Sequence, residues 1–117
     1  MMRQVHPNLI QAGRLWSGAF TPTQKDSGLL SADRSSIITP REAYERYLKT
    51  KLLNQAGGTW AVSVSEFKSI DLLCYSDPVQ DNTAHALVDY SSKEPGVRKI
   101  LGKAAYARAS ARGRLHP

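Results

Sequence analysis

One histidine stands where a side chain could carry out proton transfer. His85 lies in the alternating run AHALVDY (84–90), on the face opposite Ala84, Ala86 and Val88. An imidazole titrates near neutral pH, so a histidine that faces a cleft can act as a general acid or base. The alternative is a half-buried strand histidine with a backbone hydrogen bond, which is the more frequent case. At the level of sequence both interpretations stay open.

The stretch GLLSADRSS (28–36) holds the other candidate residues. It places the charged pair Asp33-Arg34 between a short apolar run and a helix start. Loops between a strand and a helix often display functional groups, and Arg34 can point into a cleft beside Ser31. Aspartate and serine also close such turns through hydrogen bonds to the backbone, and this structural role is the more frequent one.

Spacings typical of metal or phosphate chemistry are missing from the sequence. The three histidines, His6, His85 and His116, have no ligand-like spacing, and Cys74 is the only cysteine. A zinc site and an intramolecular disulfide are therefore not expected. Gly57-Gly58 is not followed by Lys-Ser or Lys-Thr, as a phosphate-binding loop requires. We predict no metal and no cofactor.

The sequence also gives an expectation about location. Its longest apolar runs are a few residues, whereas a membrane span needs about 20. The N-terminal MMRQVHPNL lacks the apolar region of a secretory signal. We therefore expect a soluble cytoplasmic protein with no membrane partner.

The net charge of +6 is concentrated at one end of the chain. Residues 1–94 hold equal numbers of basic and acidic residues, whereas residues 95–117 hold no acid. The excess consists of Arg98, Lys99, Lys103, Arg108, Arg112 and Arg114. A basic surface of this kind attracts phosphate backbones or acidic protein faces. The alternative is a solvated helix face that only keeps the protein in solution.

Two helices are predicted to frame these residues. In TPRE, Thr39 can be the N-cap, Pro40 takes the first helical position and Glu42 falls at N3. This capping box predicts a helix over about 40–53. A second helix is predicted over about 97–111. Its apolar stripe would consist of Val97, Ile100, Leu101, Ala104, Ala107 and Ala111.

Period-two alternation and turn formers predict the strands. They lie over about 9–20, 29–32, 59–64, 72–75 and 84–90, with a helical turn over 65–70 and residues 1–8 as a loose arm. This order predicts a single α+β domain, 1–117, with a four- to five-stranded, mostly antiparallel sheet and two main helices. Edge strands and the alanine stripe make a homodimer plausible.

Two resemblances bear on function. The string HPN…GAFTP…KDSGLLSADRSS, followed by GTWAVSV and DNTAHALVDY, resembles a group of short bacterial proteins, and this resemblance implies no activity. The order of His6, a glycine-containing apolar segment, Leu30-Ser31 and the GTWAVSV strand is similar to the ADP-ribosyltransferase superfamily, in particular the RNA 2′-phosphotransferases. The second resemblance implies a nicotinamide dinucleotide or phosphate site at His6, Arg14, Ser31 and Arg34. The sequence departs from that family at Leu29, where the family has a histidine, and it has no His-Gly-Thr.

The sequence therefore supports two functional hypotheses. The first is an accessory binding protein, in a defence or toxin–antitoxin context, whose basic C-terminal helix engages a nucleic acid or an acidic protein. The second is an ADP-ribosyltransferase-like or RNA-processing enzyme with its site near Arg14, Ser31, Arg34 and His85.

Overall fold

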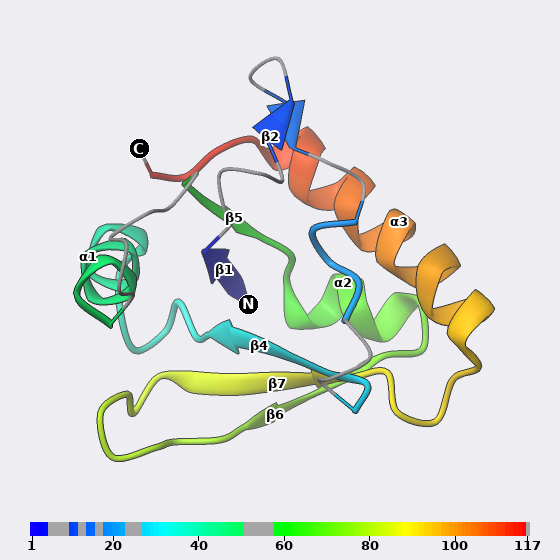
Figure 1. Ribbon diagram of the computed structural model, residues 1–117, viewed down its shortest axis with the longest axis horizontal. Helices are drawn as coiled ribbons and strands as arrows, with labels where there is room; N and C mark the ends of the chain where they lie inside the picture. Colours follow the sequence, from blue (N-terminus) through cyan, green and yellow to red (C-terminus); the bar gives the residue numbers. More distant parts are fainter. Residues whose placement is uncertain (5–9, 12–13, 16–17, 23–26, 51–57, 117) are drawn as a thin grey trace.

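The computed structural model describes residues 1–4, 10–11, 14–15, 18–22, 27–50 and 58–116, and in this part of the chain one antiparallel sheet carries three helices (Figure 1). The five sheet strands are β1 (Met2–Gln4), β4 (Leu29–Asp33), β5 (Thr59–Ala61), β6 (Leu73–Ser76) and β7 (His85–Asp89). The helices are α1 (Pro40–Thr50), α2 (Val64–Ser69) and α3 (Pro95–Arg112). A separate ribbon pairs β2 (Ile10–Gln11) with β3 (Arg14–Leu15). The sheet order is β5-β1-β4-β7-β6, which confirms the predicted α+β fold class.

The central strands β4 and β7 sort their side chains onto two faces. Directly paired residues of antiparallel strands point to the same face, and successive residues alternate. One face receives the buried pairs Leu30–Val88 and Ala32–Ala86. The other face receives the more polar pairs Ser31–Leu87 and Asp33–His85. His85, Leu87 and Asp89 therefore share a face, as the alternation predicted.

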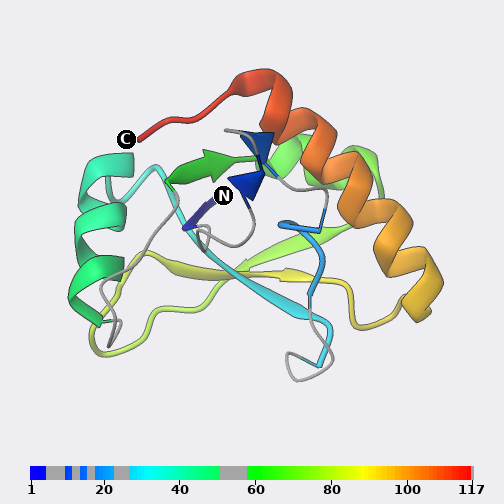
Figure 2. The same cartoon turned by 45° about the horizontal axis from the view of Figure 1, so that its top comes forward.

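Helices α2 and α3 cover the apolar face of the sheet. Phe67 of α2 and Ala105 and Ala109 of α3 are fully buried there. They complete a core whose other members are Leu15, Ala19, Phe20, Leu30, Trp60, Val62, Leu72, Val88 and Tyr90. Figure 1 and the turned view in Figure 2 both show α3 at one side of the molecule and α1 at the other, with the sheet between them.

Helix α1 packs on the second face through a smaller apolar cluster. Its members are Met2, Ile38, Ala43, Ala61 and Ala84. The predicted capping box is present, because the Thr39 hydroxyl accepts from the Glu42 N–H at 3.1 Å and the Thr39 N–H donates to the Glu42 carboxylate at 2.9 Å. The predicted extension of this helix to residue 53 lies outside the described residues.

Three sequence-based boundaries are corrected by the structure. Residues 2–4 form β1, not a loose arm, because Met2 is fully buried against α1 and Ala61. The strand predicted over 59–64 ends at Ala61, because Ser63 caps α2 in its own capping box with Glu66. In the region predicted as one strand over 9–20, the described residues give the short ribbon β2–β3 and a turn at 18–20.

The apolar stripe predicted for the C-terminal helix is rotated relative to the observed contact face. Gly102, Ala105 and Ala109 face the core, with Leu101 and Tyr106 beside them. Of the predicted stripe, Val97 is 41% exposed and Ile100 is 66% exposed. The contact face is set by close approach at Gly102, next to Thr21, and hydropathy does not register such a position.

Among the described residues, no helix combines the length and the hydropathy that a membrane crossing requires.

Candidate functional site

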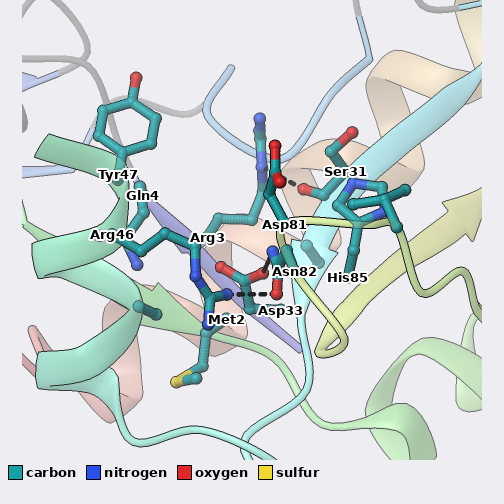
Figure 3. A pocket seen from close by; sticks show the side chains of 13 residues that line it. Met2, Arg3, Gln4, Ser31, Asp33, Arg46, Tyr47, Asp81, Asn82 and His85 are labelled. Atoms are coloured by element: carbon teal, nitrogen blue, oxygen red, sulfur yellow. Dashed lines mark hydrogen bonds between the residues drawn. The ribbon is translucent and has the colours of Figure 1, made fainter. Parts of the chain in front are cut away.

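A pocket of about 410 Å³ opens between α1 and the polar face of the sheet. This volume lies within the range of small-molecule sites. Three elements and one connection supply the polar groups that line it (Figure 3). They are Arg3 and Gln4 from β1, Ser31 and Asp33 from β4, Arg46 and Tyr47 from α1, and Asp81, Asn82 and His85 from the β6–β7 hairpin. Met2, Ala32 and Ala43 supply apolar surface.

A chain of hydrogen bonds links the helix wall of the pocket to the sheet. The Arg46 guanidinium donates to Asn82 Oδ1, and Asn82 Nδ2 donates to Asp33 Oδ1 at 2.7 Å (Figure 3). The same Asn82 oxygen accepts from the Ala84 N–H at 3.0 Å. Asn82 therefore holds a cation and an anion apart within one pocket, and both groups keep further hydrogen-bonding positions.

Gln4 carries a buried amide nitrogen at this pocket. Its Oε1 accepts a hydrogen bond from the Thr59 hydroxyl at 2.8 Å, and Thr59 is fully buried. Its Nε2 is buried and has no hydrogen-bond partner among the described residues. A buried polar donor that lacks a partner costs about 1–3 kcal/mol. A ligand atom that accepts from Gln4 Nε2 would remove this cost.

His85 is oriented by the end of the neighbouring strand. Its Nδ1 lies 3.1 Å from both the carboxylate Oδ2 and the carbonyl oxygen of Asp77, which follows β6 directly. A proton on Nδ1 satisfies these acceptors and leaves Nε2 as the basic nitrogen. The side chain is 22% exposed and His85 lines the pocket, so a half-buried imidazole lies at the cavity.

The structure brings together part of the residue set proposed from sequence. Ser31 and His85 line the same pocket, from adjacent strands. Arg34 follows Asp33 in the sequence but is not one of the residues that line the pocket. Its backbone shapes the turn before α1, because its carbonyl accepts from the Ile37 and Ile38 N–H groups at 3.0 and 3.2 Å.

The two remaining candidates give no test of the predicted set. Arg14 belongs to β3, and its side chain lies outside the described part of the structure. His6 also lies outside the described residues.

The sequence analysis missed six of the polar residues that line the pocket: Arg3, Gln4, Arg46, Tyr47, Asp81 and Asn82. Arg3 is anchored by donation from Nε to the Ser31 carbonyl at 3.1 Å and from a terminal nitrogen to the Ala19 carbonyl. Arg46 could have been found, since it lies one helical turn after Glu42 on a securely predicted helix. Nothing in the sequence marks Gln4, because β1 is only three residues long.

The basic C-terminal region divides into residues used by the fold and residues that face solvent. Arg98 donates to the Lys93 and Ser91 carbonyls at 2.8 and 3.2 Å. Arg112 pairs with Glu66 at 2.7 Å, and the Arg114 guanidinium lies 4.9 Å from the centre of the Trp60 ring. These three of the six basic residues serve internal contacts.

The other three are more available at the helix surface. Arg108 is half-buried and donates to the Ala104 carbonyl of its own helix at 3.0 Å. Lys99 and Lys103 are exposed. The basic surface of α3 therefore centres on these two lysines.

Within the described residues, no group of three or more His, Cys, Asp or Glu side chains is placed to hold a metal ion.

Comparison of this chain with protein-family models, with curated proteins and with solved structures gives no match.

Proposed function

We propose that the protein binds a small anionic ligand in the pocket between α1 and the sheet. The observation that carries this proposal is a cavity lined by both Arg46 and Gln4, whose buried Nε2 has no hydrogen-bond partner among the described residues. Both groups are hydrogen-bond donors, and a guanidinium suits carboxylate or phosphate oxygens. The pocket is thus built to receive acceptor atoms that the described part of the chain does not supply.

The acidic side chains of the pocket narrow the ligand class. Asp33 and Asp81 line the same cavity and can accept hydrogen bonds from ligand hydroxyl or amino groups. A nucleotide combines the two requirements, because its phosphate oxygens accept and its sugar and base groups donate. We therefore propose a nucleotide ligand, in agreement with the ligand that the ADP-ribosyltransferase resemblance implies.

Titration with defined nucleotides tests this proposal. NAD⁺ and AMP are added to the purified protein while the unfolding temperature is recorded, with inorganic phosphate and adenosine as part-ligands. A ligand at 100 times its Kd stabilises the folded state by about 2.7 kcal/mol. Arg46→Ala should abolish the nucleotide-dependent increase in unfolding temperature.

Arg41→Ala is the matched control, because Arg41 lies on the same helix but is 76% exposed and pairs with Glu45. This variant should respond to nucleotide as the unmodified protein does. Absence of any nucleotide response at millimolar concentration, or an unchanged response in Arg46→Ala, would refute the assignment.

Within this pocket, His85 is the candidate for proton transfer. The Asp77 contact at 3.1 Å orients the ring. With the proton on Nδ1, where Asp77 accepts it, Nε2 is free to act as the base. As a general base, Nε2 would take a proton from water or from an acceptor hydroxyl while that oxygen forms a bond to C1′ of the nicotinamide ribose of NAD⁺. The bond between C1′ and the nicotinamide nitrogen breaks, and neutral nicotinamide leaves. Release of nicotinamide from NAD⁺ is the reaction to assay.

His85→Asn should lower that rate by about 10²–10⁴-fold, the usual contribution of a general base. The nucleotide-dependent stabilisation should be retained. Asp77→Asn, which alters a positioning residue, should shift the pH profile of the rate more than its maximum. Turnover that survives His85→Asn would leave His85 with a structural role only.

A second candidate function is binding of a polyanion by α3. Lys99 and Lys103 are exposed and lie in a region without acids, and this observation favours the binding role predicted from sequence. Lys103→Glu should weaken capture of a labelled single-stranded DNA oligonucleotide, measured by fluorescence anisotropy at low salt. Lys68→Glu on α2 makes the same charge change at another exposed site and is the control. Equal losses in both variants would show a general charge effect and no α3 surface.

A further inference from the structure

The two edges of the main sheet differ in how they end. At the β5 edge the C-terminal segment adds backbone hydrogen bonds, because the Thr59 N–H donates to the His116 carbonyl at 2.5 Å and the Leu115 N–H donates to the Thr59 carbonyl at 2.8 Å. Arg112 donates to the Ala61 carbonyl at 2.9 Å. All three residues of β5 are buried, so this edge is closed.

The opposite edge, β6, is open. It is the last strand in the sheet order, and no described segment pairs with its outer side (Figure 1). The Asp77 N–H donates to the His85 carbonyl at 2.8 Å, so Asp77 directs its backbone groups toward β7, and every second residue along the strand does the same. By that alternation Tyr75 and Leu73 direct their backbone groups toward β7. The N–H and C=O groups of Cys74 and Ser76 therefore point outward.

Apolar side chains accompany this open backbone. Leu73 is 57% exposed and Tyr75 is 47% exposed, and both lie on the face that carries Leu87. Val79, just beyond β6, is 46% exposed. Natural sheets usually protect an edge with charges, proline or a covering segment. An open edge flanked by large apolar side chains is instead the surface used when an extended peptide adds a strand.

The charge around this edge indicates the chemistry of the partner. Residues 70–92 contain four aspartates, Asp71, Asp77, Asp81 and Asp89, and no lysine or arginine. Asp71 and Asp77 flank β6 at its two ends. Lys93 lies 2.5 Å from the Asp71 carboxylate and offsets that charge. The Asp77–Asp81 end thus remains acidic, and a strand with basic residues complements it.

We propose that β6 binds an extended basic peptide, which adds a sixth strand to the sheet through Cys74 and Ser76. Alternate apolar side chains of the peptide would pack on Leu73 and Tyr75. A second copy of the chain fits less well, because it would bring two segments together that contain aspartates and, over residues 70–92, no lysine or arginine. The acidic end of this surface, Val79 and Asp81, also lines the pocket, but none of the β6 residues 73–76 does, so variants of β6 test the edge without altering the pocket.

Fluorescence anisotropy with a labelled peptide of alternating valine and threonine, with lysine at both ends, tests the inference. The same peptide with glutamate at both ends is the charge control. The lysine peptide should bind, the glutamate peptide should not, and added salt should weaken binding.

Ser76→Pro is the diagnostic variant, because it removes an outward N–H and no hydrogen bond to β7. It should weaken binding of the lysine peptide by about tenfold or more, the equivalent of one backbone hydrogen bond. Ser76→Ala is the matched control and should bind normally. Leu73→Lys and Tyr75→Lys change exposed side chains without altering the backbone, and both should also weaken binding.

Three results would overturn the inference. The first is that the lysine and glutamate peptides bind equally well, or that neither peptide binds. The second is normal binding by Ser76→Pro together with both lysine variants. The third is a dimer, seen in sedimentation of the unmodified protein, that Ser76→Pro dissociates, because the occupant of the edge would then be a second copy of the chain.

Discussion

The two faces of the sheet are built from the same strands but differ in composition. Phe20, Phe67 and Tyr90 are fully buried on the face that α2 and α3 cover. On the α1 face the buried cluster contains three alanines, and polar side chains and a pocket take up the remaining space. Because β4 and β7 alternate, they supply residues to both faces at once. The difference indicates that stability comes mainly from one face, and the pocket proposed as the ligand site lies on the other.

Removal of a large side chain from the α2–α3 face should have the largest effect. Phe67 is fully buried in the core. Phe67→Ala should therefore lower the free energy of unfolding by about 3–5 kcal/mol. That is a large share of a typical total of about 5–15 kcal/mol. Urea denaturation followed by circular dichroism measures the loss.

Val64→Ala provides the control on the same helix. Val64 is 51% exposed, so its truncation should change stability by less than about 0.5 kcal/mol. Equal losses from Phe67→Ala and Val64→Ala would mean that α2 does not carry the core of the protein.

The close packing of α3 gives the next largest effect. A Cβ atom at Gly102 would lie 1.9 Å from Thr21 Oγ1 and 3.2 Å from Thr21 Cα. Gly102→Ala should therefore cost about 3 kcal/mol, at the upper end of overpacking effects. Thr21→Ala in the same chain should restore part of this loss, because it removes the hydroxyl that the new methyl group meets.

A second glycine of α3 makes the comparison sharper. A Cβ atom at Gly96 would meet no atom within 4 Å. Gly96→Ala should thus stabilise the helix by up to about 1 kcal/mol. Unfolding midpoints of the two variants that shift in the same direction would contradict the assigned contact face of α3.

The same comparison shows what the sequence could and could not predict. Capping at Thr39 and alternation in 84–90 are local signals, and the structure confirms the helix and the strand that they predicted. The contact face of α3 depends on Thr21, 81 positions away from Gly102 in the sequence, and hydropathy gives no account of it. The pocket joins β1, β4, α1 and the β6–β7 hairpin, so only His85, Ser31 and Asp33 were singled out in advance.

The contribution of Tyr90 to the stability of the core should depend on pH. Its hydroxyl donates to the buried Phe20 carbonyl at 2.6 Å. Tyr90→Phe should cost about 2 kcal/mol at neutral pH, because the carbonyl then lacks a partner in the core. Equilibrium unfolding in urea at pH 7 gives the value.

Burial raises the pKa of Tyr90 above its ordinary value. An unfolded tyrosine titrates near pH 10. The folded protein therefore holds this proton more tightly than the unfolded chain does, and the contribution of Tyr90 is present below about pH 10 and decreases as pH rises further. The stability difference between the unmodified protein and Tyr90→Phe should shrink above that pH. Other groups titrate equally in both proteins, so they cancel in this difference. If the difference in unfolding free energy stayed constant up to about pH 11, on the order of one unit above the unfolded pKa, Tyr90 would be in contact with water.

The smallest effect on folding should come from the polar face. Asp33→Asn keeps an oxygen that can accept from Asn82 and removes the negative charge at the end of the Arg46–Asn82–Asp33 chain, so we expect less than about 1 kcal/mol of destabilisation. Nucleotide binding should instead weaken by about tenfold or more, because the ligand loses the carboxylate that accepts its hydrogen bonds. Each 1.4 kcal/mol of lost interaction is a factor of about ten in the Kd. Asp71→Asn, at a side chain that is 91% exposed and outside the pocket, makes the same chemical change and should leave nucleotide binding intact. If Asp33→Asn unfolds the protein as strongly as Phe67→Ala does, the Arg46–Asn82–Asp33 chain is structural and the division of labour between the two faces does not hold.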